Sequence, residues 1–136
     1  MFACYKGQKD VVKLLLDHSE RIDLNARSIS GMSALMWACL NGHKDVVQLL
    51  LDHSDRIDFN ARDNYEDTAL MKACRNGHKD VVQLFLDHLG STIDMNARNK
   101  YGDTAFMRAC SSGQKDVVQL LLDNSNKIEL THILCT

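Results

Sequence analysis

The sequence predicts an all-α protein: a solenoid of stacked helix-turn-helix units, with a hairpin loop protruding from each unit. The first observation is a self-similar stretch that occurs four times, the first copy being shorter by three residues: 1–17, 33–52, 68–87 and 104–123. The second is a glycine at the same place in every copy, at intervals of 35, 35 and 36 residues: Gly7, Gly42, Gly77 and Gly113. We therefore expect one domain over residues 1–136, with helix pairs in these four ranges and a tail at 124–136.

The first helix of each unit is predicted from the spacing of small and apolar residues. In the third unit these residues recur three and four positions apart, which places them on one helix face: Ala69, Leu70, Ala73 and Cys74. Thr68 stands where a residue would cap the start of this helix. Gly77 is expected just after the end of this helix, because glycine tolerates the left-handed backbone conformation that often follows a helix.

The second helix begins near residue 78 and presents a broad apolar face: Val81, Val82, Leu84, Phe85 and Leu86. The next segment alternates apolar and polar residues, as at 57–60, and is too short to form an independent sheet. A turn follows around residues 64–66 and completes the hairpin loop. Neither helix can bury its apolar face alone, so neighbouring units must stack.

Residues 102–122 read GDTAFMRACSSGQKDVVQLLL. This pattern resembles the ankyrin repeat, GxTPLHxAAxxGHxxVVxLLL, and the likeness covers nearly the whole chain. The resemblance implies a non-catalytic interaction module or scaffold that grips a protein through a concave groove and its hairpin tips. Both ends of the array look cut, which predicts a fragment of a longer protein and allows end-to-end self-association.

Three departures from the family pattern carry expectations of their own. The family histidine is replaced by methionine at Met36, Met71 and Met107, so we expect apolar contacts to hold adjacent units there. Glu66 replaces a hairpin glycine, and its resistance to positive φ predicts a reshaped turn. The surplus residues 54–56 predict a slightly longer second helix.

Composition excludes several functions. A formal charge of −2 provides no strong field for nucleic acid or an anionic membrane. No apolar run approaches the roughly 18 residues of a membrane span. The expected address is the cytoplasm, with the nucleus as the alternative.

The cysteines and histidines favour structural roles. Four cysteines occupy one position in successive units, too far apart for disulfides, and predict small buried residues in a reducing compartment: Cys4, Cys39, Cys74 and Cys110. Cys135, near the end, is expected to be exposed and reactive. Five of the six histidines stand at the family's structural position or at the ends of second helices: His18, His43, His53, His78 and His88. We expect no metal, no cofactor and no catalytic group.

Variation between units points to the binding surface. It falls on the first-helix face opposite the core: Phe2, Tyr5, Lys6, Trp37, Leu40, Asn41, Lys72, Arg75, Asn76, Arg108, Ser111 and Ser112. It also falls in the hairpins: Ile29, Met32, Asn64, Tyr65, Asp67, Arg98, Lys100, Tyr101 and Asp103. The resemblance implies that both sets line one groove. The amino-terminal half is apolar and the carboxy-terminal half cationic, which predicts a protein or peptide with an apolar anchor and an acidic stretch.

Four alternatives stay open at this point. Trp37 and Phe2 could face a neighbouring unit instead of a groove. Arg27, Arg62 and Arg98 could form a cationic ladder, although local pairing with Asp23, Asp58 and Asp94 is favoured. The chain could act as a self-associating structural array through its ends. It could also be the regulatory arm of a larger enzyme or channel.

Overall fold

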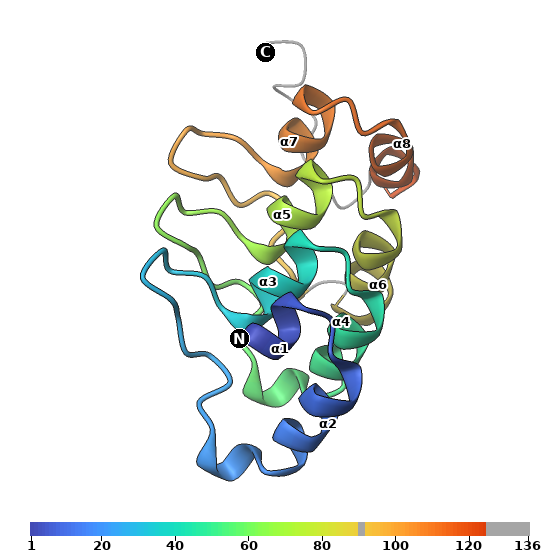
Figure 1. Ribbon diagram of the computed structural model, residues 1–136. Coiled ribbons are helices and arrows are strands. Elements are labelled where there is room, and N and C mark those ends of the chain that lie inside the picture. The colour runs from blue at the N-terminus through green and yellow to red at the C-terminus, as the bar shows by residue number, and fades with distance from the viewer. Residues whose placement is uncertain (90–91, 125–136) are drawn as a thin grey trace.

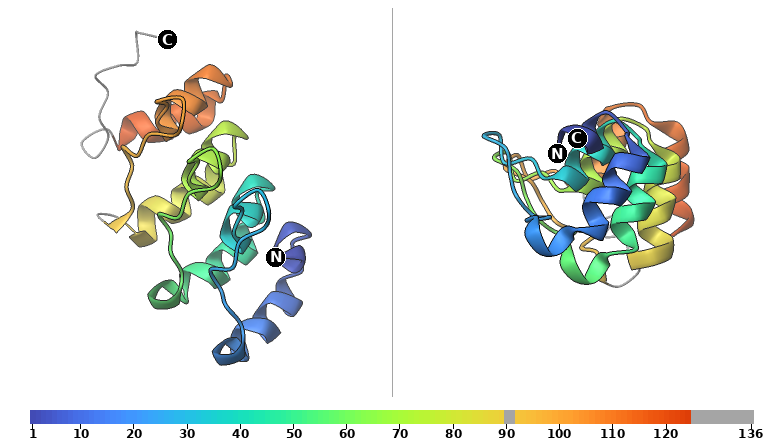
Figure 2. Two further views of the ribbon diagram at one scale, coloured as in Figure 1. Left: turned by 90° about the vertical axis from the view of Figure 1, so that its left-hand side faces the viewer. Right: turned by 60° about the horizontal axis from the view of Figure 1, so that its bottom comes forward.

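The computed structural model describes residues 1–89 and 92–124. Within them the chain is helical and contains no strand, which confirms the predicted fold class. The α-helices are α1 (Phe2–Tyr5), α2 (Lys9–Asp17), α3 (Ala34–Leu40), α4 (Lys44–Leu51), α5 (Ala69–Arg75), α6 (Lys79–Leu89), α7 (Ala105–Ser111) and α8 (Lys115–Asp123). Figure 1 shows two layers, with α1, α3, α5 and α7 in one and α2, α4, α6 and α8 in the other. The hairpins project from one side of the stack (Figure 2).

Three of the inner helices, α3, α5 and α7, begin at side-chain caps, as predicted. Ser33, Thr68 and Thr104 each accept a hydrogen bond from the backbone N–H three residues on, at 3.2–3.3 Å. This bond satisfies one of the donors that a helix start leaves unpaired. These three helices therefore start at the same position of their units.

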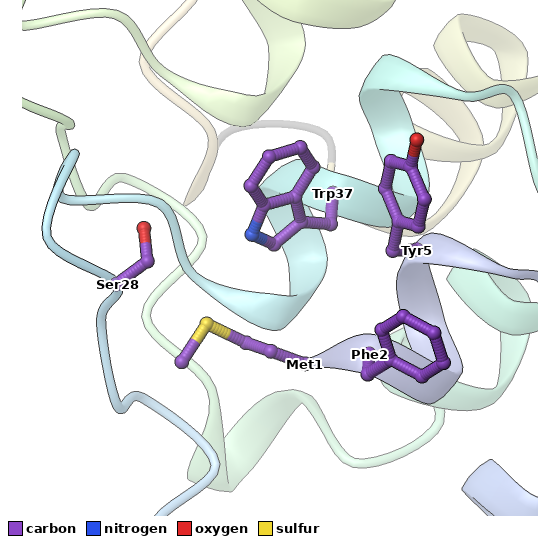
Figure 3. A pocket seen from close by; sticks show the side chains of 5 residues that line it. All are labelled: Met1, Phe2, Tyr5, Ser28 and Trp37. Atoms are coloured by element: carbon purple, nitrogen blue, oxygen red, sulfur yellow. The ribbon is translucent and has the colours of Figure 1, made fainter.

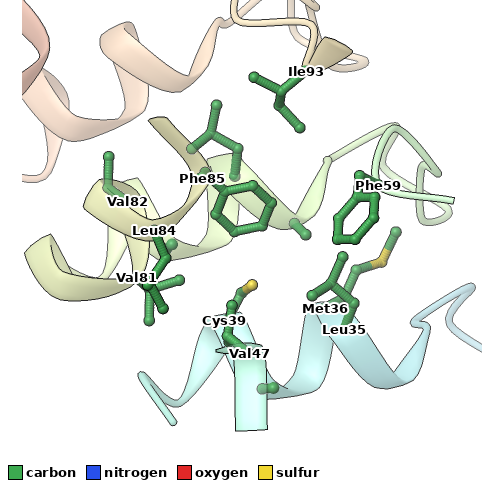
Figure 4. Packing of buried hydrophobic residues seen from close by; sticks show 14 of the residues in the cluster. Leu35, Met36, Cys39, Val47, Phe59, Val81, Val82, Leu84, Phe85 and Ile93 are labelled. Atoms are coloured by element: carbon green, nitrogen blue, oxygen red, sulfur yellow. The ribbon is translucent and has the colours of Figure 1, made fainter. Parts of the chain in front are cut away.

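The core runs along the stack between the two helix layers. Ala38, Ala73 and Ala109 are completely buried in α3, α5 and α7, where their small side chains allow the inner helices to approach one another. Larger side chains from the outer helices and the hairpins fill the space beside them, as Figure 4 shows around Phe85. The rings of Phe59 and Phe85 meet edge to face, with their centroids 6.3 Å apart.

The methionines and thiols lie in this core. Met36 and Met71 are buried, as expected for side chains that only pack. Cys39 and Cys74 are free and fully buried, and burial raises the pKa of both thiols because it disfavours the thiolate. Cys110 is only partly buried, unlike its counterparts. Cys135 lies outside the described residues.

A polar side chain at the start of α4, α6 and α8 joins each of these units to the preceding one. The Nε2 atoms of His43 and His78 donate to the carbonyl oxygens of Tyr5 and Leu40, at 2.8 and 2.9 Å. Gln114 takes the same role in the last unit and donates to the carbonyl oxygen of Arg75 at 3.0 Å. We call these three bonds the inter-unit bonds, and they hold successive units in one register.

The hairpin arginines also join neighbouring units. Arg27 donates to the carbonyl oxygen of Arg62 at 2.8 Å, and Arg62 donates to that of Arg98 at 2.7 Å. The favoured local pairing with Asp23, Asp58 and Asp94 is wrong for the described residues. Asp23 instead accepts from the backbone N–H of Asn25, because its short side chain can close a local turn.

The surplus residues do not lengthen the second helix. Helix α4 ends at Leu51, and residues Ser54–Arg56 form a separate 3₁₀ turn. This turn redirects the chain so that Ile57 enters the core. The expectation of a longer helix is therefore wrong.

The turn at Glu66 keeps the shape of its glycine counterparts, contrary to expectation. Glu66 has a φ of 63°, and Gly102 at the same place has a φ of 81°. In both hairpins the residue donates to the carbonyl oxygen three positions back, at 2.9 and 3.0 Å. Bonds to neighbouring hairpins hold the turn in place, so Glu66 accepts a conformation that is unfavourable for a side chain.

Replacing Glu66 with glycine should therefore stabilise the protein by about 1 kcal/mol, because the left-handed conformation then carries no steric cost. The free energy of unfolding in urea measures the effect. Gly102→Ala is the matched control and should destabilise by a similar amount, since the space around Gly102 is open and only the conformation changes. A Glu66→Gly variant less stable than the parent would contradict the interpretation that Glu66 is held in an unfavourable backbone conformation.

Lys72 is buried beneath the hairpins and does not face a groove. Its Nζ lies 2.7 Å from Asp63 Oδ2 and 3.7 Å from Asp67 Oδ2, and all three side chains are at most 8% exposed. Asn99 donates to Asp67 at 2.8 Å, and Asp63 accepts the backbone N–H groups of Tyr65 and Asp67. Within the described residues, no buried polar side-chain atom lacks a partner.

Lys72→Ala should lower the free energy of unfolding by roughly 3–5 kcal/mol, because two carboxylates then stay buried without their counter-charge. Chemical unfolding followed by circular dichroism gives the value. Lys79→Ala on the exposed surface of α6 is the matched control and should change stability by no more than about 0.5 kcal/mol. Equal stabilities for the two variants would mean that Lys72 is solvated, as the sequence suggested.

Candidate functional site

Three aromatic side chains gather where α1 and α3 lie side by side. The rings of Tyr5 and Trp37 meet edge to face at 5.2 Å between centroids, and Phe2 stacks beside Tyr5 at 6.4 Å. Figure 3 shows them at the mouth of a pocket, with Met1 beside them and the hairpin of Ser28 opposite. Phe2 is 74% exposed and Tyr5 40%, so this aromatic cluster faces solvent.

The pocket has a volume of about 430 Å³ and is lined by Met1, Phe2, Tyr5, Ser28 and Trp37. The aliphatic and aromatic surfaces of these side chains dominate the lining, and the hydroxyl group of Ser28 is already engaged. The hydroxyl of Ser28 accepts the backbone N–H of Met32 at 3.2 Å and lies 2.9 Å from that of Ser30. What the pocket offers an incoming group is therefore apolar contact.

A cation lies at the edge of the aromatic cluster. The Nζ atom of Lys6 is 5.4 Å from the centroid of the Tyr5 ring and 5.8 Å from that of Phe2. Such a position over aromatic rings favours the ammonium group by about 0.5–1 kcal/mol at an exposed site. The pocket thus combines an apolar interior with one positive charge at its rim.

Three of the expected binding residues are buried, so their assignment to the surface is wrong. Met32 is 5% exposed, and Asp67 and Lys72 are 6% exposed. Met32 turns into the core, while Asp67 and Lys72 face each other beneath the hairpins. Each hairpin folds back over its inner helix, and this covers side chains that the helix period alone places on an outer face.

The amides near the pocket are exposed but bonded to the backbone. Asn41 donates to the carbonyl oxygen of Trp37 at 2.9 Å, and Asn76 donates to that of Leu40 at 3.1 Å. Leu40 itself is half-buried. Asn41 and Asn76 extend the surface from α3 towards α5. They also provide hydrogen-bond donors for the backbone carbonyl oxygens of Trp37 and Leu40.

The carboxy-terminal half is less cationic than the sequence suggested. Lys72 is neutralised, and Arg108 lies 3.5 Å from Asp103 in a partly exposed ion pair. Arg98 donates to the carbonyl oxygen of Gly102 at 2.9 Å and remains exposed. Arg75 is half-buried, and Lys100 is exposed at a hairpin tip. Ser111 and Ser112 are exposed at the end of α7.

The hairpin tips form a connected row. Asn64 N donates to the carbonyl oxygen of Ser30 at 3.1 Å, and Lys100 N donates to that of Tyr65 at 2.9 Å. The side chain of Asn64 adds a bond to the carbonyl oxygen of Ile29 at 2.9 Å. These bonds fix the spacing of the exposed side chains of Ile29, Tyr65 and Tyr101.

Sequence reasoning missed Met1 and Ser28 as parts of the pocket. Ser28 takes the place of the buried Asp63 in the next unit and of Asn99 in the last. A short side chain at this hairpin position leaves room beside Trp37, and the comparison of Ser28 with Asp63 was the signal available.

Neither a metal-ligand cluster nor a membrane-spanning helix is found in the described part of the chain. Residues 1–89 and 92–124 contain no group of three or more histidine, cysteine or acidic side chains placed to hold a metal ion. Over the same residues, no helix is both long and apolar enough to cross a bilayer.

Comparison with known proteins agrees with this architecture. A family model described as ankyrin repeats, with three copies, matches residues 1–63 and again residues 55–132. No curated protein gives a significant match. Together the two matches span residues 1–132. This range includes all the helices and hairpins described above. The chain belongs to the ankyrin-repeat family.

Proposed function

We propose that the chain binds a segment of another protein, seating a large apolar side chain of that segment in the pocket beside Trp37. Ankyrin repeats are generally protein-interaction modules. The observation that carries the proposal is the solvent-open pocket of about 430 Å³ beside the aromatic cluster. Exposed aromatic side chains of this kind are enriched at the energetic centres of protein interfaces.

The pocket is built on elements that the stack already holds rigid. Trp37 stands on α3, which the inter-unit bond from His43 ties to α1 through the carbonyl oxygen of Tyr5. A preformed site loses little conformational entropy when it binds, so more of the apolar burial contributes to affinity. Apolar contact is sufficient for binding at this site.

The charges favour an acidic neighbour for the anchor. Lys6 lies at the rim of the pocket, and Arg75 and Lys100 lie further along the surface. We infer a partner with an apolar anchor followed by acidic residues. Because Lys72 is buried against Asp63, this surface has one cation fewer, and the apolar anchor is expected to supply most of the affinity.

We place this binding activity in the cytoplasm or the nucleus. Cys39 and Cys74 are free and buried, which suits a reducing compartment.

Short synthetic peptides test the proposal. One carries a central phenylalanine followed by aspartates, a second carries serine in place of phenylalanine, and a third carries lysines in place of the aspartates. The fluorescence of Trp37, the single tryptophan of the chain, reports occupancy of the pocket. We expect the first peptide to bind most tightly and the serine peptide most weakly, because apolar burial supplies most of the affinity.

Phe2→Ser should weaken binding of the phenylalanine peptide by about tenfold, equivalent to about 1.4 kcal/mol. Ile22→Ser is the matched control, because Ile22 is 37% exposed and does not line this pocket. It should leave the affinity unchanged. Equal binding of the phenylalanine and serine peptides would refute the pocket as an anchor site.

A further inference from the structure

The first unit exposes an aliphatic face on α2 that later units largely cover. Val11, Leu14 and Leu15 on α2 are 47%, 60% and 41% exposed. Of the equivalent residues on α4 and α6, Leu49 is half-buried, and the others expose at most 8%: Val46, Leu50, Val81, Leu84 and Phe85. We call the surface of Gln8, Val11, Leu14, Leu15 and Ile22 the amino face.

The last described helix, α8, exposes the complementary surface. Leu122 on α8 is 41% exposed, whereas its counterparts Leu16, Leu51 and Leu86 expose at most 7%. Beside it lies a depression of about 350 Å³, lined by Cys110, Gly113, Gln114, Lys115, Val118 and Gln119. We call the surface around this depression and Leu122 the carboxy face.

Inside the chain, a side chain of the next unit fills the place of this depression. A methyl group at Gly7 would collide with the ring of His43, and one at Gly42 would collide with that of His78. At Gly113 the same methyl group would meet no atom of the described residues within 4 Å. Within residues 1–89 and 92–124, the place of this side chain is therefore open on the carboxy face.

The side chain of Gln8 on the amino face is of the right kind to fill the depression at Gly113. It occupies the position of His43, His78 and Gln114 in its own unit and is exposed. Gln114 shows that glutamine makes the inter-unit bond, since it donates to the carbonyl oxygen of Arg75 at 3.0 Å. The equivalent carbonyl group at the last inner helix is that of Ser111.

A second contact of the internal interface can also be repeated. Gln48 Nε2 lies 3.2 Å from His88 Nε2 of the following unit. On the carboxy face the equivalent residue is Gln119, and on the amino face the equivalent residue is His18. Both ends thus present polar pairs that match an interface already made within the chain.

We propose that the carboxy face of one molecule receives the amino face of a second copy, so that copies stack head to tail in the register of the repeats. Gln8 of the incoming copy enters the depression at Gly113 and donates to the carbonyl oxygen of Ser111, while Val11, Leu14 and Leu15 cover Leu122 and Val118. The interface continues the one that the chain forms between its own units. The hairpin tips lie outside both faces.

Sedimentation equilibrium of the whole chain over a range of concentrations tests the proposal. The mean mass of the parent protein should rise with concentration, because a head-to-tail contact of this kind does not close on itself. Leu14→Glu on the amino face and Leu122→Glu on the carboxy face should each give a monomer. Ser30→Glu adds the same charge at a hairpin tip, away from both faces, and should assemble like the parent.

Mixing the two blocked variants identifies the geometry. Each keeps one intact face, so an equimolar mixture should form one-to-one dimers and nothing larger. Gln8→Ala should weaken association of the parent while leaving its aliphatic face intact. Circular dichroism should give parental helicity for every variant, since Leu14 and Leu122 are already exposed.

Three results would overturn the proposal. A parent protein that stays monomeric at all concentrations would leave the two faces to another occupant. A Leu122→Glu variant that still associates alone would indicate contact between amino faces. A mixture of blocked variants that stays monomeric would show that the two faces do not recognise each other.

Discussion

Hydrogen bonds from the starts of three outer helices, α4, α6 and α8, to the preceding units set the spacing of the stack. His43, His78 and Gln114 reach back to the carbonyl groups of Tyr5, Leu40 and Arg75 over 2.8–3.0 Å. These carbonyl groups lie near the ends of the inner helices, where backbone acceptors have no partner inside the helix. Each side chain therefore satisfies a polar group that stacking would otherwise bury unpaired. The spacing of the aromatic cluster and of the hairpin tips follows from this contact.

Much of the fold follows from residues that act locally or repeat at a fixed period. The position of Thr68 before an apolar helix face predicts that it caps the helix, and the position of Ala73 on that face predicts that it is buried. The structure confirms both predictions. The repeat itself predicts stacking, because no unit can bury its apolar face alone. Glu66 shows the limit of local preference, since neighbouring hairpins hold it at positive φ against its own tendency.

The candidate site was less predictable, because it depends on what one element lays over another. The helix period places Trp37 and Lys72 at equivalent positions, yet Trp37 lines an open pocket and Lys72 is buried against Asp63. The difference arises in the hairpins, where Ser28 offers no carboxylate to the second unit and Asp63 offers one to the third. Variation between repeats therefore has two meanings in this chain: a change of surface at Trp37 and a change of core chemistry at Lys72.

The inter-unit bond is the central claim, and His78 tests it most directly. The chain supplies its own matched substitution, because Gln114 performs the same role in the last unit. We predict that His78→Gln keeps the free energy of unfolding within about 1 kcal/mol of the parent, while His78→Ala lowers it by roughly 1–3 kcal/mol through an unpaired carbonyl group. Urea unfolding of the three proteins provides the comparison. If His78→Ala is as stable as His78→Gln, apolar packing alone sets the register and the account is wrong.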